Sequence, residues 1–185
     1  DRKETFLEGF GGVDHDHGVH SITAGPDGRF YFTAGNAGPH VVEDASGWTL
    51  RSGVREDSAS GRTVLESDDG RKWLNGLLLR VDPDGTDLSV RGHNFRNNYE
   101  GFADSFGDQW MNDNDDDGYE STRVTWVMPE GNYGYASADG LRSWGEDRRP
   151  DQSTFTAHWH QEDPGVLPAG DHTGPGAPTG IALYE

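Results

Sequence analysis

Histidine and aspartate alternate over residues 14–20, which read Asp-His-Asp-His-Gly-Val-His. Side chains two positions apart share a face when the backbone is extended, so this spacing can gather several polar groups. Imidazole and carboxylate groups bind transition metals, and a histidine titrates close enough to neutrality to act as a general base. Three interpretations stay open for this segment: a catalytic base, a metal site, and an ordinary polar surface loop.

A second polar segment, residues 92–101, contains Arg96 and Asn97 side by side. A guanidinium presents a rigid fork of donors that suits carboxylate or quinone oxygens, and an amide beside it can donate and accept. The structural alternative is that Arg96 pairs with a local carboxylate while Asn97 caps a turn.

An acidic run over residues 112–120 is typical of a calcium loop. Asp113, Asp115 and Asp117 alternate before a glycine and fit the first half of a D-x-D-x-D-G loop, in which alternate carboxylates converge on a hard cation. An EF-hand requires glutamate at the twelfth position, which is Val124 here, so we expect a shorter loop closed by Glu120 or by a remote group. The alternative is a solvated acidic turn without an ion.

A further group of histidines, His158 and His160, flanks a tryptophan. The spacing places both imidazoles on one face if the segment is a strand. The alternative is structural packing, in which both rings are satisfied by their neighbours.

The composition narrows the classes of function. The chain has 185 residues, no cysteine, and a net charge of −18 from 15 basic and 33 acidic residues. Such acidity disfavours nucleic acid and anionic membranes as partners, and the lack of cysteine excludes disulfides and zinc–thiolate sites. No apolar run approaches the roughly 18 residues of a membrane span. The chain begins at Asp1 rather than methionine, which predicts processing or excision from a longer protein.

Turn signals followed by short aromatic or branched runs predict an all-β protein. A Gly-Pro-Asp-Gly turn at 25–28 precedes one such run, and Asp-Pro-Asp-Gly at 82–85 separates two more. We expect strands at 29–34, 76–82, 87–91, 109–112, 123–128 and 181–184. Residues 36–72 are polar and predict an insertion or long loop.

Repeated strand–turn–strand units favour a β-propeller with long loops. At roughly 40–50 residues per blade, residues 1–185 supply about three to four blades, so the remaining blades must come from the same polypeptide or from partner chains.

The same motifs, in this order, resemble PQQ-dependent glucose/sorbosone dehydrogenase-like propellers. The segment that contains His17 and then the 25–28 turn is similar to the blade that carries the family's catalytic histidine. Residues 75–85, 92–97, 130–135 and 177–180 resemble later hairpins and blade entries of that family. Residues 102–117, 131–138 and 158–165 are similar to bacterial propeller domains described as membrane-bound dehydrogenases, which often carry a haem c domain.

The resemblance implies a six-bladed propeller that oxidises a sugar or another alcohol with calcium and PQQ. His17 would take the hydroxyl proton, Arg96 would stabilise charge on the quinone oxygen, and Asn97 would orient the cofactor together with Asn114. It also implies a haem c electron acceptor and a periplasmic or extracellular location.

A second hypothesis needs no catalysis. A calcium-stabilised propeller would bind a carbohydrate or a partner protein, and its tryptophans would stack on sugar rings or fill the core. The candidates are Trp110, Trp126, Trp144 and Trp159.

Overall fold

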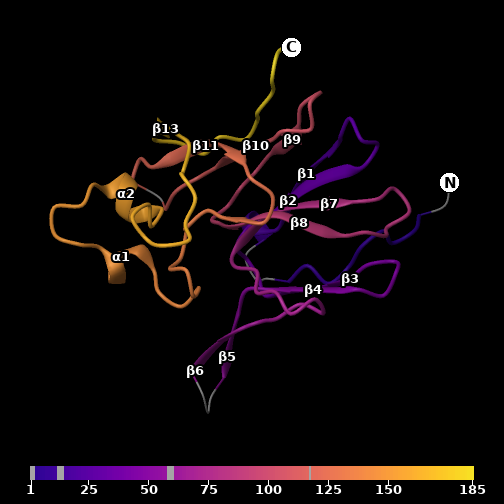
Figure 1. Ribbon diagram of the computed structural model, residues 1–185, viewed down its shortest axis with the longest axis horizontal. Helices are drawn as coiled ribbons and strands as arrows, with labels where there is room; N and C mark the ends of the chain where they lie inside the picture. Colours follow the sequence, from indigo (N-terminus) through magenta and orange to yellow (C-terminus); the bar gives the residue numbers. More distant parts are fainter. Residues whose placement is uncertain (1–2, 12–14, 58–60, 117) are drawn as a thin grey trace.

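A computed structural model describes residues 3–11, 15–57, 61–116 and 118–185. These residues form an all-β structure with 6% helix, which confirms the predicted fold class, and no closed barrel or propeller is detected among them. Two sheets and two hairpins make up the molecule, with the larger sheet between the other sheet and one hairpin (Figure 1).

The larger sheet has five strands in the order β1–β2–β7–β8–β12. Its strands are β1 (Val19–Ala24), β2 (Phe30–Ala34), β7 (Gly76–Val81), β8 (Ser89–Phe95) and β12 (Gly131–Asn132). All neighbours are antiparallel except β12, which runs parallel to β8. Phe32 pairs with Leu79 and Ala34 with Leu77, so these four side chains share one face.

The smaller sheet has four antiparallel strands in the order β13–β11–β10–β9. Its strands are β9 (Gly101–Ala103), β10 (Gln109–Asp113), β11 (Thr122–Val127) and β13 (Asp171–Gly174). Two threonine hydroxyls join it to the larger sheet: Thr33 donates to the carbonyl of Tyr99 at 3.0 Å, and Thr23 donates to that of Gly101 at 3.1 Å.

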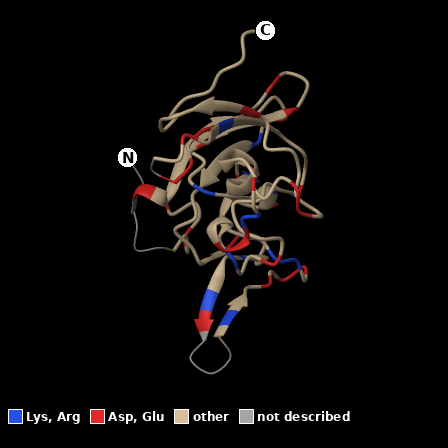
Figure 2. Ribbon diagram, turned by 90° about the vertical axis from the view of Figure 1, so that its left-hand side faces the viewer, with Lys and Arg blue, Asp and Glu red and all other residues tan. Residues whose placement is uncertain are grey.

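Residues 36–72 contain two hairpins where the sequence predicts an insertion or long loop. They are β3 (His40–Glu43) with β4 (Thr49–Ser52), and β5 (Val54–Asp57) with β6 (Gly61–Val64). Asp44 builds the first turn, because its Oδ1 accepts the backbone N–H groups of Ser46 and Trp48. The second hairpin projects from the body of the molecule (Figure 2).

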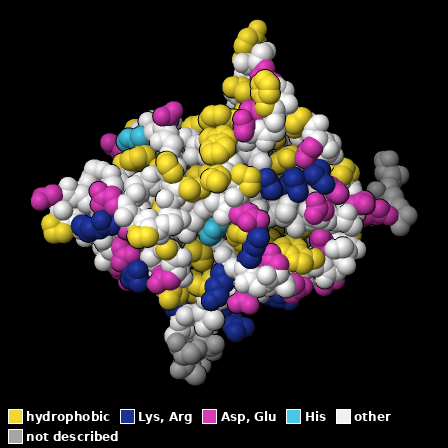
Figure 3. All heavy atoms as spheres, in the orientation of Figure 1, with side chains coloured by type: hydrophobic (Ala, Val, Ile, Leu, Met, Phe, Trp, Pro, Cys, Tyr) yellow, Lys and Arg dark blue, Asp and Glu magenta, His cyan; other side chains and the backbone are white. Residues whose placement is uncertain are grey.

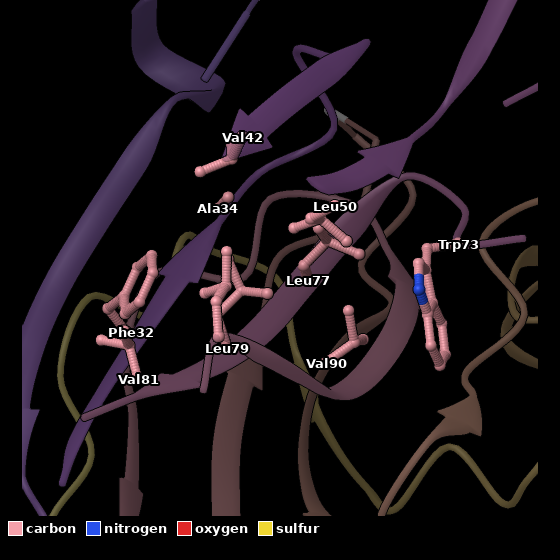
Figure 4. Close-up of a cluster of buried hydrophobic side chains, with 10 residues drawn as sticks. Phe32, Ala34, Val42, Leu50, Trp73, Leu77, Leu79, Val81 and Val90 are labelled. Carbon is pink, nitrogen blue, oxygen red and sulfur yellow. The ribbon is translucent and has the colours of Figure 1, made fainter. Parts of the chain in front are cut away.

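The larger sheet is covered on both faces, as its continuous leucine run requires. On one face, Phe32, Leu77 and Leu79 pack with Val42 and Leu50 of the first hairpin (Figure 4).

The opposite face holds a second buried cluster that belongs to both sheets. Leu78 points to this side and packs with Phe95, Met111, Val127 and Tyr133. Alternation along β7 therefore fixes both the register and the stacking of the sheets.

Among the described residues, helix is confined to three short pieces: η1 (His15–His17), α1 (Trp144–Asp147) and α2 (Thr154–His158). Ser143 and Ser153 precede the two α-helices as N-caps. Within the described ranges, none of these helices has the length or apolar character to cross a membrane. Residues 158–160 are not a strand, so the condition for a shared face is not met: His158 ends α2 and His160 lies in the turn after it.

Five of the six predicted strands are confirmed as β2, β7, β8, β10 and β11. The sixth, at 181–184, is wrong: these residues adopt no regular structure. Ile181 donates only to the Glu100 side chain at 3.1 Å, and Tyr184 is 99% exposed. An apolar run without a neighbouring strand cannot complete a ladder.

Candidate functional site

The candidate site lies at the seam between the two sheets, just beyond the ends of β8 and β10. Asn97, two residues after β8, forms an isolated antiparallel bridge with Asn114, which directly follows β10. The polar residues singled out at 92–101 and 112–120 are therefore neighbours in space.

Asp116 is the centre of the most connected polar cluster at this seam. Its Oδ1 accepts from Arg96 Nε at 2.8 Å and from the Tyr135 hydroxyl at 3.0 Å. Its Oδ2 accepts from the indole N–H of Trp144 at 3.0 Å. We call Asp116, Arg96, Tyr135, Trp144 and the adjacent His158 the Asp116 cluster.

His158 is fully buried beneath this carboxylate. Its Nε2 lies 3.1 Å from the Asp116 backbone nitrogen and 3.4 Å from Oδ2. Because a backbone N–H always donates, Nε2 accepts here and the ring is neutral in this geometry.

The environment keeps Asp116 ionised. Burial opposes the charge, but the hydrogen bond from Trp144 and the charge of Arg96 hold the pKa of Asp116 well below its usual range. Burial raises the pKa of the Tyr135 hydroxyl, and the nearby charge of Asp116 raises it further.

A cleft of about 350 Å³ opens beside this cluster. Asp116, Tyr135 and Trp144 form part of its lining. The other polar residues of the lining are Asn36, Asn75, Arg62, Arg142, Ser143 and Glu146. We call it the Trp144 cleft. On the face of the molecule shown in Figure 3, acidic and basic side chains are interspersed rather than gathered into single-sign patches.

His17 reaches the Trp144 cleft through Asn36. Its Nδ1 lies 2.6 Å from Asn36 Oδ1, and the Asn36 backbone donates to the carbonyl of Arg96 at 2.8 Å. Because an amide oxygen only accepts, Nδ1 donates in this contact, and in the neutral ring the lone pair then lies on Nε2. Asn36 thus links the His17 side chain to the Arg96 backbone, while a pocket shared by His17 and Arg96 stays a prediction.

Asn97 turns away from the Asp116 cluster. Its Oδ1 accepts from His20 Nε2 at 2.9 Å, and His20 stacks on Tyr99 with ring centroids 4.3 Å apart. Asn97, Asn114, His20 and Tyr99 line a second cleft of about 340 Å³. Of the predicted cofactor residues, Asn97 and Asn114 therefore line this second cleft, whereas Arg96 contacts Asp116.

Two carboxylates of the predicted calcium loop, Asp113 and Asp115, have separate protein partners. Asp113 is fully buried and pairs with Arg123 at 2.8 Å, while it also accepts the Arg96 backbone N–H. Asp115 accepts the backbone N–H of Ser121. Glu120 is exposed, and Asp117 lies outside the described residues.

Sequence reasoning did not single out Asp116 or Arg123. Asp116 is one of four aspartates in the run, and only the fold separates it from the others. Trp144 was one of four candidate stacking residues. The structure distinguishes it, because Trp159 is completely buried and Trp126 is exposed outside the cleft.

Comparison of the chain with protein-family models and with curated proteins finds no match. The similarity to dehydrogenase propellers therefore stays a prediction.

Proposed function

We propose that the Trp144 cleft binds a sugar or a related polyol. The observation that carries the proposal is an aromatic wall, Trp144 and Tyr135, fixed to an ionised Asp116 inside a cleft of about 350 Å³. This volume falls at the lower end of the roughly 300–1,000 Å³ typical of small-molecule sites.

The chemistry of the lining matches that of a sugar. A pyranose has apolar C–H faces, which pack on aromatic rings, and hydroxyls, which both donate and accept. Asn36 and Asn75 provide donors and acceptors, Arg62 provides donors, and Glu146 provides acceptors. Because Arg96 and Asp116 already neutralise each other, the cleft does not require a charged ligand.

Tryptophan fluorescence and ligand-observed NMR with a panel of neutral mono- and disaccharides test this proposal. We expect saturable binding that Trp144→Ala weakens at least about tenfold, equivalent to about 1.4 kcal/mol. Trp126→Ala is the matched control, since Trp126 also donates its indole N–H to an aspartate but lies outside the cleft. Equal affinities for the two variants, or no binding to any sugar, would contradict the proposal.

A second candidate function is oxidation of the bound alcohol with His17 as the base. The observation that favours it is the Asn36 contact, which leaves the Nε2 lone pair of His17 available for a proton. The predicted PQQ contact is weaker, because Asp116 and Tyr135 already engage the Arg96 guanidinium. PQQ, which would accept the hydride, would therefore have to compete with Asp116 for Arg96.

Dye-linked sugar oxidation in the presence of added PQQ and calcium separates the two functions. If His17 is the base, His17→Gln lowers the rate by about 10²–10⁴ while sugar binding and melting temperature stay unchanged. Sugar binding without any oxidation would exclude the second candidate and leave the first intact.

We also propose that the two sheets are blades of a larger propeller that further chain segments or partners complete. The support is the edge strand β1, where Val19 is 49% and Ile22 is 60% exposed. Unpaired edges with exposed apolar residues favour further packing. Calcium at 113–120, a haem c acceptor and a periplasmic or extracellular location remain predictions.

A further inference from the structure

A histidine and two aspartates converge next to the Trp144 cleft, in a place that the sequence analysis did not assign. Asp147 ends α1, and His160 and Asp163 lie in the turn that follows α2. One ligand atom from each of the three residues lies within 4.8 Å of the others.

The decisive feature is the imidazole of His160, which is 3% exposed. Its Nδ1 lies 2.7 Å from the carbonyl oxygen of Gly134, which only accepts, so Nδ1 carries the proton. Its Nε2 is buried and has no hydrogen-bond partner among the described residues. That lone pair faces Asp147 Oδ2 at 3.6 Å.

A buried lone pair opposite carboxylates is unfavourable unless something positive lies between them. A proton on Nε2 would interact with Asp147 alone, and the 3.6 Å between Nε2 and Asp147 Oδ2 is longer than a hydrogen bond. A cation would instead coordinate all three side chains. We propose that Asp147, His160 and Asp163 bind one divalent first-row transition ion of the Zn²⁺ class.

The donor set and its supports fit such an ion. Imidazole nitrogen favours Zn²⁺ and its neighbours in the series over Ca²⁺ and Mg²⁺, which take oxygen ligands. Ligands at about 2.0–2.2 Å in a tetrahedron lie roughly 3.4 Å apart, and the His160–Asp147 pair already has this spacing. Three protein ligands leave a fourth position for water.

Neighbouring groups hold each ligand as outer-shell partners do in metal sites. The Gly134 carbonyl fixes the ring of His160. Arg142 donates to Asp147 Oδ1 at 2.8 Å, and Arg149 donates to Asp163 Oδ1 at 2.5 Å. Each carboxylate thus keeps its second oxygen for the ion. The site does not depend on the proposed function, although it would fasten α1, which carries Trp144, to the 160–163 turn.

Calorimetric titration of the chelator-treated full chain with ZnCl₂ and CaCl₂ tests the proposal. We expect one Zn²⁺ per chain, a higher melting temperature with Zn²⁺, and no comparable effect of Ca²⁺. Asp147→Asn and Asp163→Asn should each weaken Zn²⁺ binding at least about tenfold. Glu162→Gln is the matched control, because Glu162 shares the Arg149 contact but lies outside the triad, and it should change the affinity less than twofold.

Nitrogen-15 NMR of the imidazoles identifies the ligand atom directly and does not depend on the variants. Zn²⁺ should shift the Nε2 resonance of His160 while Nδ1 keeps its proton. The proposal is overturned if Zn²⁺ binds elsewhere with the His160 signal unchanged, if Ca²⁺ binds as well as Zn²⁺, or if both nitrogens carry protons at neutral pH with or without zinc.

Discussion

Asp113 and Asp116 lie three residues apart in one acidic run, yet the fold gives them opposite environments. Asp113 is completely buried, with Arg123 as its partner, and neither side chain reaches solvent. Asp116 is 29% exposed and borders a cleft. Burial raises the pKa of Asp113 against the opposing effect of Arg123, whereas donors and nearby charge lower the pKa of Asp116.

The difference shows that partners and burial, rather than residue type, decide what a carboxylate does. Asp113 and Arg123 join β10 to β11, and the guanidinium carbon lies 3.5 Å from the ring centroid of Trp159. This pair is part of the core. Asp116 fixes two aromatic side chains at the edge of a cavity, so its contacts shape a surface that a ligand can reach.

Arg123→Met gives the largest expected effect, because it leaves the Asp113 charge buried without its partner. We expect the free energy of unfolding to fall by about 3–5 kcal/mol, measured by urea denaturation. Arg51→Met, which breaks the exposed ion pair with Asp68, is the control and should cost about 1 kcal/mol or less.

The double variant Asp113→Leu/Arg123→Met sharpens the test. Replacement of both members of a buried pair by apolar side chains removes the unpaired charge, so it should restore part of the stability that Arg123→Met loses. If Arg123→Met is as stable as the Arg51→Met control, the Asp113 charge does not depend on Arg123 for compensation. The contrast with Asp116 would then lose its basis.

The strands could be predicted where local pattern and burial agree. The leucine run of β7 and the aromatic run of β2 are apolar because both faces of their sheet are covered, and their turns contain Pro, Asp and Gly. The hairpins within 36–72 were not predicted. Each of their strands has only four residues, and so short an alternation of apolar and polar side chains is a weak indication of a strand. The strand predicted at 181–184 had the right residues but has no neighbouring strand.

The candidate site was predictable only in part. The types and spacing of His17, Arg96 and Asn97 marked polar segments that do meet at the seam between the sheets. Their partners were not visible, because Asn36, Asp116 and Tyr135 come from distant parts of the chain and only tertiary structure brings them together. The orientation of consecutive side chains was also not predictable: Arg96 contacts Asp116, whereas Asn97 lines the second cleft.

Asp116→Asn should give a smaller effect that depends on pH. The folded-state pKa of Asp116 is lowered, so its ionised form stabilises the fold above the unfolded value of about 3.9, and this stabilisation disappears as the pH falls through the folded-state pKa. At pH 7 we expect Asp116→Asn to cost about 1–3 kcal/mol, since hydrogen bonds to a charged group are lost. As the pH falls from about 5 to about 2, the difference in stability between wild type and Asp116→Asn should shrink, because only the wild type has this carboxylate to protonate.

Asp69→Asn is the control. It removes an exposed carboxylate 3.9 Å from Arg71 and should show a small difference in stability at every pH. Urea denaturation at a series of pH values measures all three proteins. A stability difference that stays constant with pH would mean that Asp116 acts through shape rather than charge, and the distinction from Asp113 would then rest on burial alone.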